Sequence, residues 1–266
     1  MKFGVLGGLS VRDAGGDHLP TAPKQRQLLA LLLLHANHVV PVRVCLAEIW
    51  GEDPPPSAGT TLQTYVMHLR RLLARLPSVG SREAAHDRLR MSGSGYVLRV
   101  APQELDLTCF QELVARAGRL PASEAGAASR LLGEAMELWS RPMLADVRTG
   151  PVLQPAVIHW EQRRLAVHEE YLDTRLRLGC PRDVLPELAV LTRRHPTHEP
   201  LHTRYMSALY AVGRTGDALD ACARLTRRLA EDLGVAPSPA VDRIRAVIRA
   251  GGPAPRVLGP RPAPVS

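Results

Sequence analysis

The amino-acid sequence predicts a mainly α-helical protein with small β-sheets, divided into two domains and a tail. The chain has 266 residues, more than one domain usually holds, and 45% of them are hydrophobic, enough to fill two cores. Glycine-broken apolar segments open the chain, whereas helical periodicity fills its second half. We expect residues 1–101 and 106–250 to form the domains, and residues 251–266, rich in Pro and Gly, a flexible tail.

The first forty residues predict a small antiparallel sheet followed by a buried helix. Phe3 to Leu6 and Leu9 to Arg12 are short apolar segments, and Gly15 to Asp17 supplies a turn. Pro23 suits the first turn of a helix, and leucines then recur at helical spacing. A first helix is therefore expected over Pro23 to His35.

A second helix and a stiff acidic loop come next. Val39 and Val40 are extended before Pro41, and apolar residues from Val42 to Trp50 share one helical face that ends at Gly51. The loop that follows consists of Glu52, Asp53, Pro54, Pro55, Pro56 and Ser57.

The third helix, roughly Thr60 to Leu76, separates an apolar face from a basic one. Its apolar face holds Leu62, Val66, Leu69 and Leu73. Its other face carries Thr60, Thr64, Met67, His68, Arg71 and Arg75, with Gln63 and Arg70 on the flank. A merely solvated helix usually mixes Glu with Arg to gain salt bridges, whereas a helix that faces DNA gains from excluding acids. The absence of carboxylates on this face favours DNA over a solvated surface.

A hairpin with the pattern of a wing follows. Arg88 to Met91 predicts a strand, residues 92–95 a glycine turn, and residues 96–98 a second strand. Arg88 and Arg90 alternate with Leu89 and Met91, which sends both arginines to one side of the strand. There they would reach phosphates or a minor groove. Together with the preceding helices, the hairpin predicts a winged helix-turn-helix.

The positive charge of the chain is concentrated in this region. The formal net charge is +8, but residues 1–59 are balanced and the second half nearly so. Residues 60–100 hold only two carboxylates, Glu83 and Asp87, against seven arginines: Arg70, Arg71, Arg75, Arg82, Arg88, Arg90 and Arg99. A polyanionic partner would therefore be held mainly here.

The second half predicts only helices, separated by Gly and Pro at short intervals. The later helices follow one another in pairs, as in a tetratricopeptide-like all-α array. Gly213, Ala218 and Leu225 fit such repeats, although Cys222 stands where an aromatic residue is commoner. The expected helices are Leu107 to Ala117, Ser123 to Trp139, Gln154 to Leu178, Arg182 to Arg194, Glu199 to Val212, Gly216 to Leu233 and Pro239 to Ala250.

No motif predicts an enzyme, a metal site or a cofactor. The segment from His168 to Leu172 resembles the start of a zincin helix, but Leu172 takes the place of the second histidine. We interpret it as an exposed helix face. The four cysteines lie far apart without zinc spacing, and no P-loop, dinucleotide fingerprint or nucleophile elbow occurs. We expect no catalytic residues.

The sequence predicts a cytoplasmic protein. Its longest apolar stretch, Leu28 to Leu34, is far shorter than the roughly 20 residues of a membrane helix. Gly7, Gly8, Arg12 and Asp13 interrupt any secretory apolar run at the N-terminus. No membrane partner is expected.

Several segments together resemble the Streptomyces antibiotic regulatory proteins along nearly the whole chain. The N-terminal segments are Phe3 to Gly7, Lys24 to Leu32, Ile49 to Pro55, Thr61 to Leu72 and Gly95-Tyr96. The later ones are Ala135 to Trp139, Ala208 to Arg214 and Asp232 to Pro239, with a departure at Ser140 to Pro142. The resemblance implies an OmpR-type winged helix followed by a helical bacterial transcriptional activation domain.

The resemblance also implies how DNA is bound. In that family the third helix enters the major groove and the hairpin touches the neighbouring minor groove. Thr61 and Arg71 would then lie near phosphates, and Gln63, Thr64, His68 and Arg70 near base edges. The complete set of expected DNA-binding residues is Thr60, Thr61, Gln63, Thr64, Met67, His68, Arg70, Arg71, Arg75, Arg88, Arg90, Ser92 and Ser94.

The expected partners follow from the same resemblance. It implies an activator of a secondary-metabolite pathway that binds direct repeats in double-stranded promoter DNA as a homodimer, within the nucleoid. Glu52 to Ser57 is then a candidate contact with the sigma subunit of RNA polymerase, and a simple stiff connector is an equal alternative. The main rival is a protein-interaction adaptor without specific DNA binding. A ligand-sensing role for the helical half also stays open.

Overall fold

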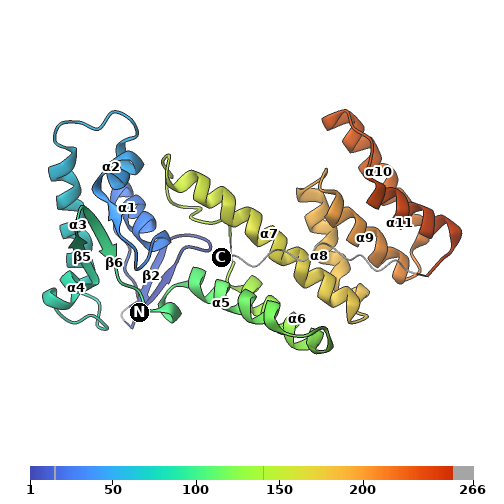
Figure 1. The fold of residues 1–266 in the computed structure, drawn as a ribbon, viewed down its shortest axis with the longest axis horizontal. Helices are drawn as coiled ribbons and strands as arrows, with labels where there is room; N and C mark the ends of the chain where they lie inside the picture. Colours follow the sequence, from blue (N-terminus) through green and yellow to red (C-terminus); the bar gives the residue numbers. More distant parts are fainter. Residues whose placement is uncertain (15, 140, 254–266) are drawn as a thin grey trace. The chain divides into compact units, whose positions relative to one another are not determined.

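The computed structural model describes residues 1–14, 16–139 and 141–253 of the chain. They form two compact units that do not follow chain order (Figure 1). Among the described residues, the first contains those of Met1–Val114 and Glu134–Leu165, and the second contains Ala115–Gly133 and Ala166–Pro253. Residues 106–114 and the described part of residues 134–165, expected in the second domain, thus pack with the first unit. Most of the predicted tail, residues 254–266, lies outside the described residues.

An antiparallel sheet opens the first unit, as predicted. It consists of β1 (Lys2–Gly4), β2 (Ser10–Asp13) and β3 (Gly16–Asp17) in that order. Phe3 lies opposite Val11, and both side chains are buried. Gly15 lies outside the described residues, and the interpretation of Gly16 and Asp17 as part of a turn was wrong, because both pair with β2 as a third strand.

Three helices build the core of the first unit. They are α1 (Pro23–Leu34), α2 (Val42–Trp50) and α3 (Ala58–Ala74). The side chains from Leu28 to Leu33 are at most 2% exposed, so α1 is buried against the other elements. Gly51 closes α2 with a φ of 73° and donates its N–H to Ala47 O. The helix α3 begins two residues before its predicted start, and it ends at Ala74.

A short helix and the wing complete this part of the fold. They are α4 (Arg82–Arg88), β5 (Leu89–Ser92) and β6 (Gly95–Leu98), and β4 (Val40–Pro41) pairs with β6 to give the order β4-β6-β5. The helix α4 was not predicted, and Arg88, expected in the strand, is its last residue. A Cβ on Gly95 would lie 2.2 Å from Val40 O, so only glycine allows these strands to approach.

Three further helices each contribute residues to both units. They are α5 (Asp106–Arg119), α6 (Ala125–Glu137) and α7 (Leu153–Arg177), with a 3-10 turn at Pro102–Glu104 before α5 and another at Ala122–Glu124 before α6. Their first-unit parts meet at Trp139, which packs edge-on against Phe110 at 5.6 Å, with the Arg164 guanidinium 5.0 Å from the ring.

The buried carboxylate of Glu48 fastens α2 to the first turn of α7. Glu48 is 1% exposed. Its Oε1 accepts hydrogen bonds from Gln27 Nε2 at 2.8 Å and Gly150 N at 2.6 Å. Its Oε2 accepts from Val152 N at 2.9 Å and Leu153 N at 2.8 Å. A negative group at a helix N-terminus also complements the helix dipole, and this contact explains why residues 150–153 join the first unit.

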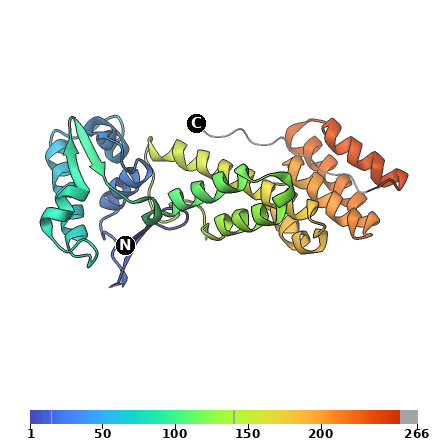
Figure 2. The same cartoon turned by 60° about the horizontal axis from the view of Figure 1, so that its bottom comes forward.

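The second unit is a stack of helical pairs (Figure 2). Beyond α7 it contains α8 (Pro181–Arg194), α9 (Glu199–Ala211), α10 (Thr215–Leu233) and α11 (Pro239–Ala250), each within a few residues of its predicted range. Their shared core includes Met206, Leu209, Leu225 and Ile244. No helix in the described part of the chain is long and apolar enough to cross a membrane.

Candidate nucleic-acid interface

The helix α3 presents the two faces that its sequence predicts. Leu62, Val66, Leu69 and Leu73 are each 1% exposed and fix the helix on the core. The residues exposed on its other side are Thr60, Gln63, Thr64, Met67, Arg71 and Arg75. None of these is acidic, so the surface offers hydrogen-bond donors and positive charge without a repelling carboxylate.

The threonines of α3 bond to their own helix. Thr61 Oγ1 donates to Ser57 O at 2.9 Å, and Thr64 Oγ1 donates to Thr60 O at 3.1 Å. Each hydroxyl proton is thereby used, which leaves the oxygen as an acceptor and the methyl group for apolar contact. Thr64 is exposed and Thr61 is half-buried at the helix start.

His68 is half-buried rather than fully available. Its Nδ1 lies 2.8 Å from Gln25 Nε2 of α1. This contact fixes the imidazole ring on the seam between the two helices. Gln25 was not among the predicted site residues, because the contact joins residues 43 positions apart.

Arg70 connects α3 to the wing. Its Nε donates to Leu89 O, at the start of β5, over 2.7 Å. Partial burial lowers the pKa of the Arg70 guanidinium, which still stays charged at neutral pH. The structure thus gives Arg70 a role in holding the hairpin beside α3, which the resemblance did not imply.

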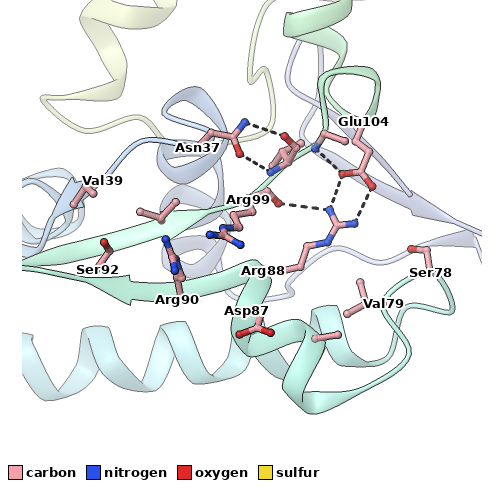
Figure 3. Close-up of a pocket in the computed structure, with 14 residues that line it drawn as sticks. Asn37, Val39, Ser78, Val79, Asp87, Arg88, Arg90, Ser92, Arg99 and Glu104 are labelled. Carbon is pink, nitrogen blue, oxygen red and sulfur yellow. Dashed lines mark hydrogen bonds and ion pairs between the residues drawn. The ribbon is translucent and has the colours of Figure 1, made fainter.

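The wing and the residue that follows it expose two arginines, Arg90 and Arg99 (Figure 3). Arg90 and Ser92 lie on the side of β5 that lines an open hollow of about 770 Å³, together with Arg99 from the end of β6. Arg90 is exposed, and no ion pair holds it among the described residues. Gly93 turns the hairpin with a φ of 57°, and Ser94 is exposed beside it.

Arg88 lines the same hollow, but it is half-buried and its guanidinium is already paired. Its Nη1 and Nη2 donate to the two carboxylate oxygens of Glu104 at 2.6 and 3.0 Å (Figure 3). Arg88 ends α4, and it lines the same hollow as Arg90, on the side that the alternation with Leu89 predicts. Burial raises the pKa of Glu104, but the bonds from Arg88 and from Ala101 N outweigh it, so that pKa is lowered overall.

The loop before α3 is exposed throughout. Every residue from Glu52 to Ser57 is exposed. Its beginning is held by Trp50, which stacks on Tyr65 of α3 at 6.1 Å and lies under the Lys24 ammonium at 4.8 Å. The loop therefore presents two carboxylates from a fixed base.

The described residues contain no group of three His, Cys, Asp or Glu side chains placed to hold a metal ion. The cysteines Cys45, Cys109, Cys180 and Cys222 are free thiols. Burial raises the pKa of the Cys45 thiol to about 12, which keeps it protonated and unreactive.

Comparisons with known proteins identify both halves of the chain. Residues 105–249 match the family model "Bacterial transcriptional activator domain", and residues 16–84 match "Transcriptional regulatory protein, C terminal". The regulatory protein DnrI of Streptomyces peucetius is 39% identical over 94% of this chain and 93% of its own length. The regulatory protein AfsR of Streptomyces griseus is 36% identical, and this chain spans 23% of its length.

A solved structure is similar to the whole described fold. The structure of Mycobacterium tuberculosis EmbR, in complex with a low-affinity phosphopeptide, matches with a TM-score of 0.87 and 30% sequence identity. The match covers 96% of this chain and 66% of that chain.

Proposed function

The chain belongs to the Streptomyces antibiotic regulatory protein family of DNA-binding transcriptional activators, and on that premise we propose how it binds and activates promoters. The helix α3 enters the major groove, and the β5–β6 hairpin follows the adjacent minor groove. The observation that carries the proposal is the exposed, acid-free side of α3.

Individual side chains take distinct roles in this proposal. Arg71 and Arg75 contact phosphates near the exposed end of α3, and Thr61 does so at its beginning. Gln63 and Thr64 contact base edges, because they are exposed in the middle of the acid-free side.

The wing supplies the second set of contacts. Arg90 contacts DNA backbone or minor groove with Ser92 and Ser94 from the turn, whereas Arg70 positions the hairpin through Leu89 O. Arg88 is withdrawn from the predicted set because Glu104 occupies its guanidinium. Thr60, Met67 and His68 border the contact surface.

Two protomers bind tandem direct repeats in this proposal. The chain holds one winged helix in residues 1–101, so reading two repeats requires two copies. The helical domain of residues 106–250 holds the two protomers together. The promoter that they bind belongs to a secondary-metabolite pathway. Support comes from the family that both halves match.

The loop Glu52–Ser57 contacts RNA polymerase, including its sigma subunit. Its full exposure and its base at Trp50 support this role. Replacing Glu52 and Asp53 together by Ala is expected to leave affinity for promoter DNA unchanged and to reduce run-off transcription. The matched control is Asp232→Ala, another exposed acid. If the loop variant supported as much run-off transcription as the wild type, the loop would be only a stiff connector.

A gel-shift experiment with fragments of the source genome separates the activator from the adaptor alternative. The full chain is incubated with a digested genomic library, and retained fragments are sequenced. The proposal expects enrichment of fragments that share a repeated motif upstream of genes. Retention without any shared motif would favour an adaptor whose basic helix is only a solvated surface.

A further inference from the structure

The second unit contains a cavity that the DNA-binding role does not use. Its volume is about 820 Å³, within the range of sites that hold one small organic ligand. Its lining comes from the end of α5, the start of α6, one side of α7 and the beginnings of α9 and α11. All of these residues belong to the second unit.

One wall of the cavity is apolar and made of small side chains. Ala125 and Ala128 lie one turn apart on α6, and Ala166 faces the cavity from α7. Larger side chains at these positions would occupy the space. The wall therefore suits the apolar part of a ligand.

The opposite side is charged: four carboxylates, those of Glu169, Glu170, Asp173 and Glu199, line the cavity with three arginines, Arg119, Arg177 and Arg204. Arg204 is 3% exposed. Its Nε and Nη2 donate to the two oxygens of Asp173 at 2.8 and 2.7 Å. Its Nη1 lies 3.0 Å from Glu169 Oε2.

The carboxylate of Glu199, which also lines the cavity, accepts a hydrogen bond from Ser238 N at 2.8 Å. Arg119 and Arg177 are exposed and Arg204 is the buried arginine of the lining, so carboxylates outnumber guanidinium groups in the buried part of the cavity. In this partly buried setting a further positive charge would be attracted, and a negative one repelled.

The segment of α7 that lines the cavity is the one that the sequence left without a function. Glu169 and Asp173 lie one turn apart on the same side as Ala166. The segment from His168 to Leu172 was interpreted as an exposed helix face, whereas Glu169 is only 16% exposed in its side chain.

We propose that this cavity binds an amphipathic organic cation, with its apolar part against the alanine wall and a protonated amine at Glu169, Asp173 and Glu199. This proposal goes beyond DNA binding, because it assigns the helical half a binding site for a small molecule. It depends on neither α3 nor the wing.

Ligand-observed NMR on the full chain tests the site with two probes of the same apolar group and opposite charge, phenylbutylamine and phenylbutyrate. With each probe at millimolar concentration, we expect saturation transfer from the protein to the amine, and weaker transfer to the acid. The net charge of +8 would favour the acid in any non-specific association. Preference for the amine therefore indicates the carboxylate-lined site.

Two variants locate the binding. Ala128→Trp fills the cavity and is expected to abolish transfer to the amine, whereas Ala246→Trp, on the exposed side of α11, leaves it unchanged. Glu169→Gln keeps the Asp173–Arg204 pair and is expected to weaken amine binding about fivefold. It tests the site even where Ala128→Trp fails to fold.

Three results would overturn the proposal. They are no transfer to the amine, equal transfer to amine and acid, or undiminished binding of the amine in Glu169→Gln. These three results do not depend on DNA binding, so the amine site and the gel-shift test of DNA binding can fail independently of each other.

Discussion

Arg71 and Gln63 are both exposed on α3, but they are expected to contribute to DNA binding in different ways. Arg71→Ala should weaken binding to all DNA sequences and reduce the magnitude of the salt slope by about 2, because one phosphate contact is lost in each of the two protomers. Gln63→Ala should cost about 1–3 kcal/mol on the specific site alone. Fluorescence anisotropy on specific and unrelated duplexes measures both.

Arg243→Ala is the matched control for Arg71→Ala, because Arg243 is an exposed arginine of α11. Equal losses in the two variants would indicate a general charge effect and contradict a phosphate contact by α3.

Arg70→Ala is expected to weaken specific binding by about 1–3 kcal/mol. The structure adds a second effect, because Leu89 O loses the Arg70 Nε donor, at a cost of about 1 kcal/mol in folding stability. Denaturant unfolding and DNA titration of the same variant separate the two effects. Unchanged DNA affinity would contradict the placement of α3 and the wing on DNA.

The Arg88–Glu104 pair predicts a pH dependence of the wing. The pKa of Glu104 in the folded protein is lowered from 4.5, so the carboxylate stabilises the fold above that pH. This stability is lost as the pH falls through the lowered folded-state pKa. Unfolding followed from pH 6 to pH 3 should show a smaller loss of stability in Glu104→Gln than in wild type, and equal losses would refute the role of this pair.

At this scale, the sequence predicts which side chains of α3 are exposed but not which contacts restrain them. Helical periodicity separates Leu62 from Gln63 and Thr64. It cannot show that His68 meets Gln25, or that Arg88 meets Glu104, since these contacts depend on the packing of separate elements.

The connection between α2 and α7 predicts large effects of two substitutions. Glu48→Ala leaves three backbone N–H donors without their acceptor and removes one of the two acceptors of Gln27 Nε2, and it should lower the free energy of unfolding of the first unit by about 3 kcal/mol or more. Gly150→Ala should also destabilise it, because the new Cβ would lie 2.1 Å from Glu48 O.

Tryptophan fluorescence during denaturant unfolding measures these effects selectively. Trp50, Trp139 and Trp160 all belong to the first unit. Glu52→Ala, an exposed acid on the following loop, is the matched control and should leave the unfolding midpoint unchanged. An unfolding midpoint of Glu48→Ala equal to that of the wild type would show that the Glu48 hydrogen bonds contribute little to the stability of the first unit.

Most elements were predictable because their signals are local. Pro at first turns and Gly at helix ends place α8 to α11 within a few residues. The helix α4 was missed although Ser81 caps it, accepting a hydrogen bond from Ala84 N. Its seven residues are too few for apolar periodicity to show. The Glu48 connection links residues more than 100 positions apart, so no local signal reveals it.

At the scale of the whole molecule, each of the two units holds one of the two proposed binding sites. The first contains the proposed DNA contacts and the exposed loop, and the second contains the proposed amine site. The helices α5, α6 and α7 contribute residues to both units. The sequence predicts two domains, but long-range contacts such as those of Glu48 decide which residues pack together.

The most direct test of the central claim is a titration of the full chain on a fragment from the genomic selection, repeated between 50 and 200 mM salt. With about three arginine–phosphate contacts in each of two protomers, a log–log slope of about −5 is expected. The selected fragment should bind at least about a thousandfold more tightly than unrelated duplex. A flat salt response, or equal affinity for both duplexes, would contradict binding through α3 and the wing.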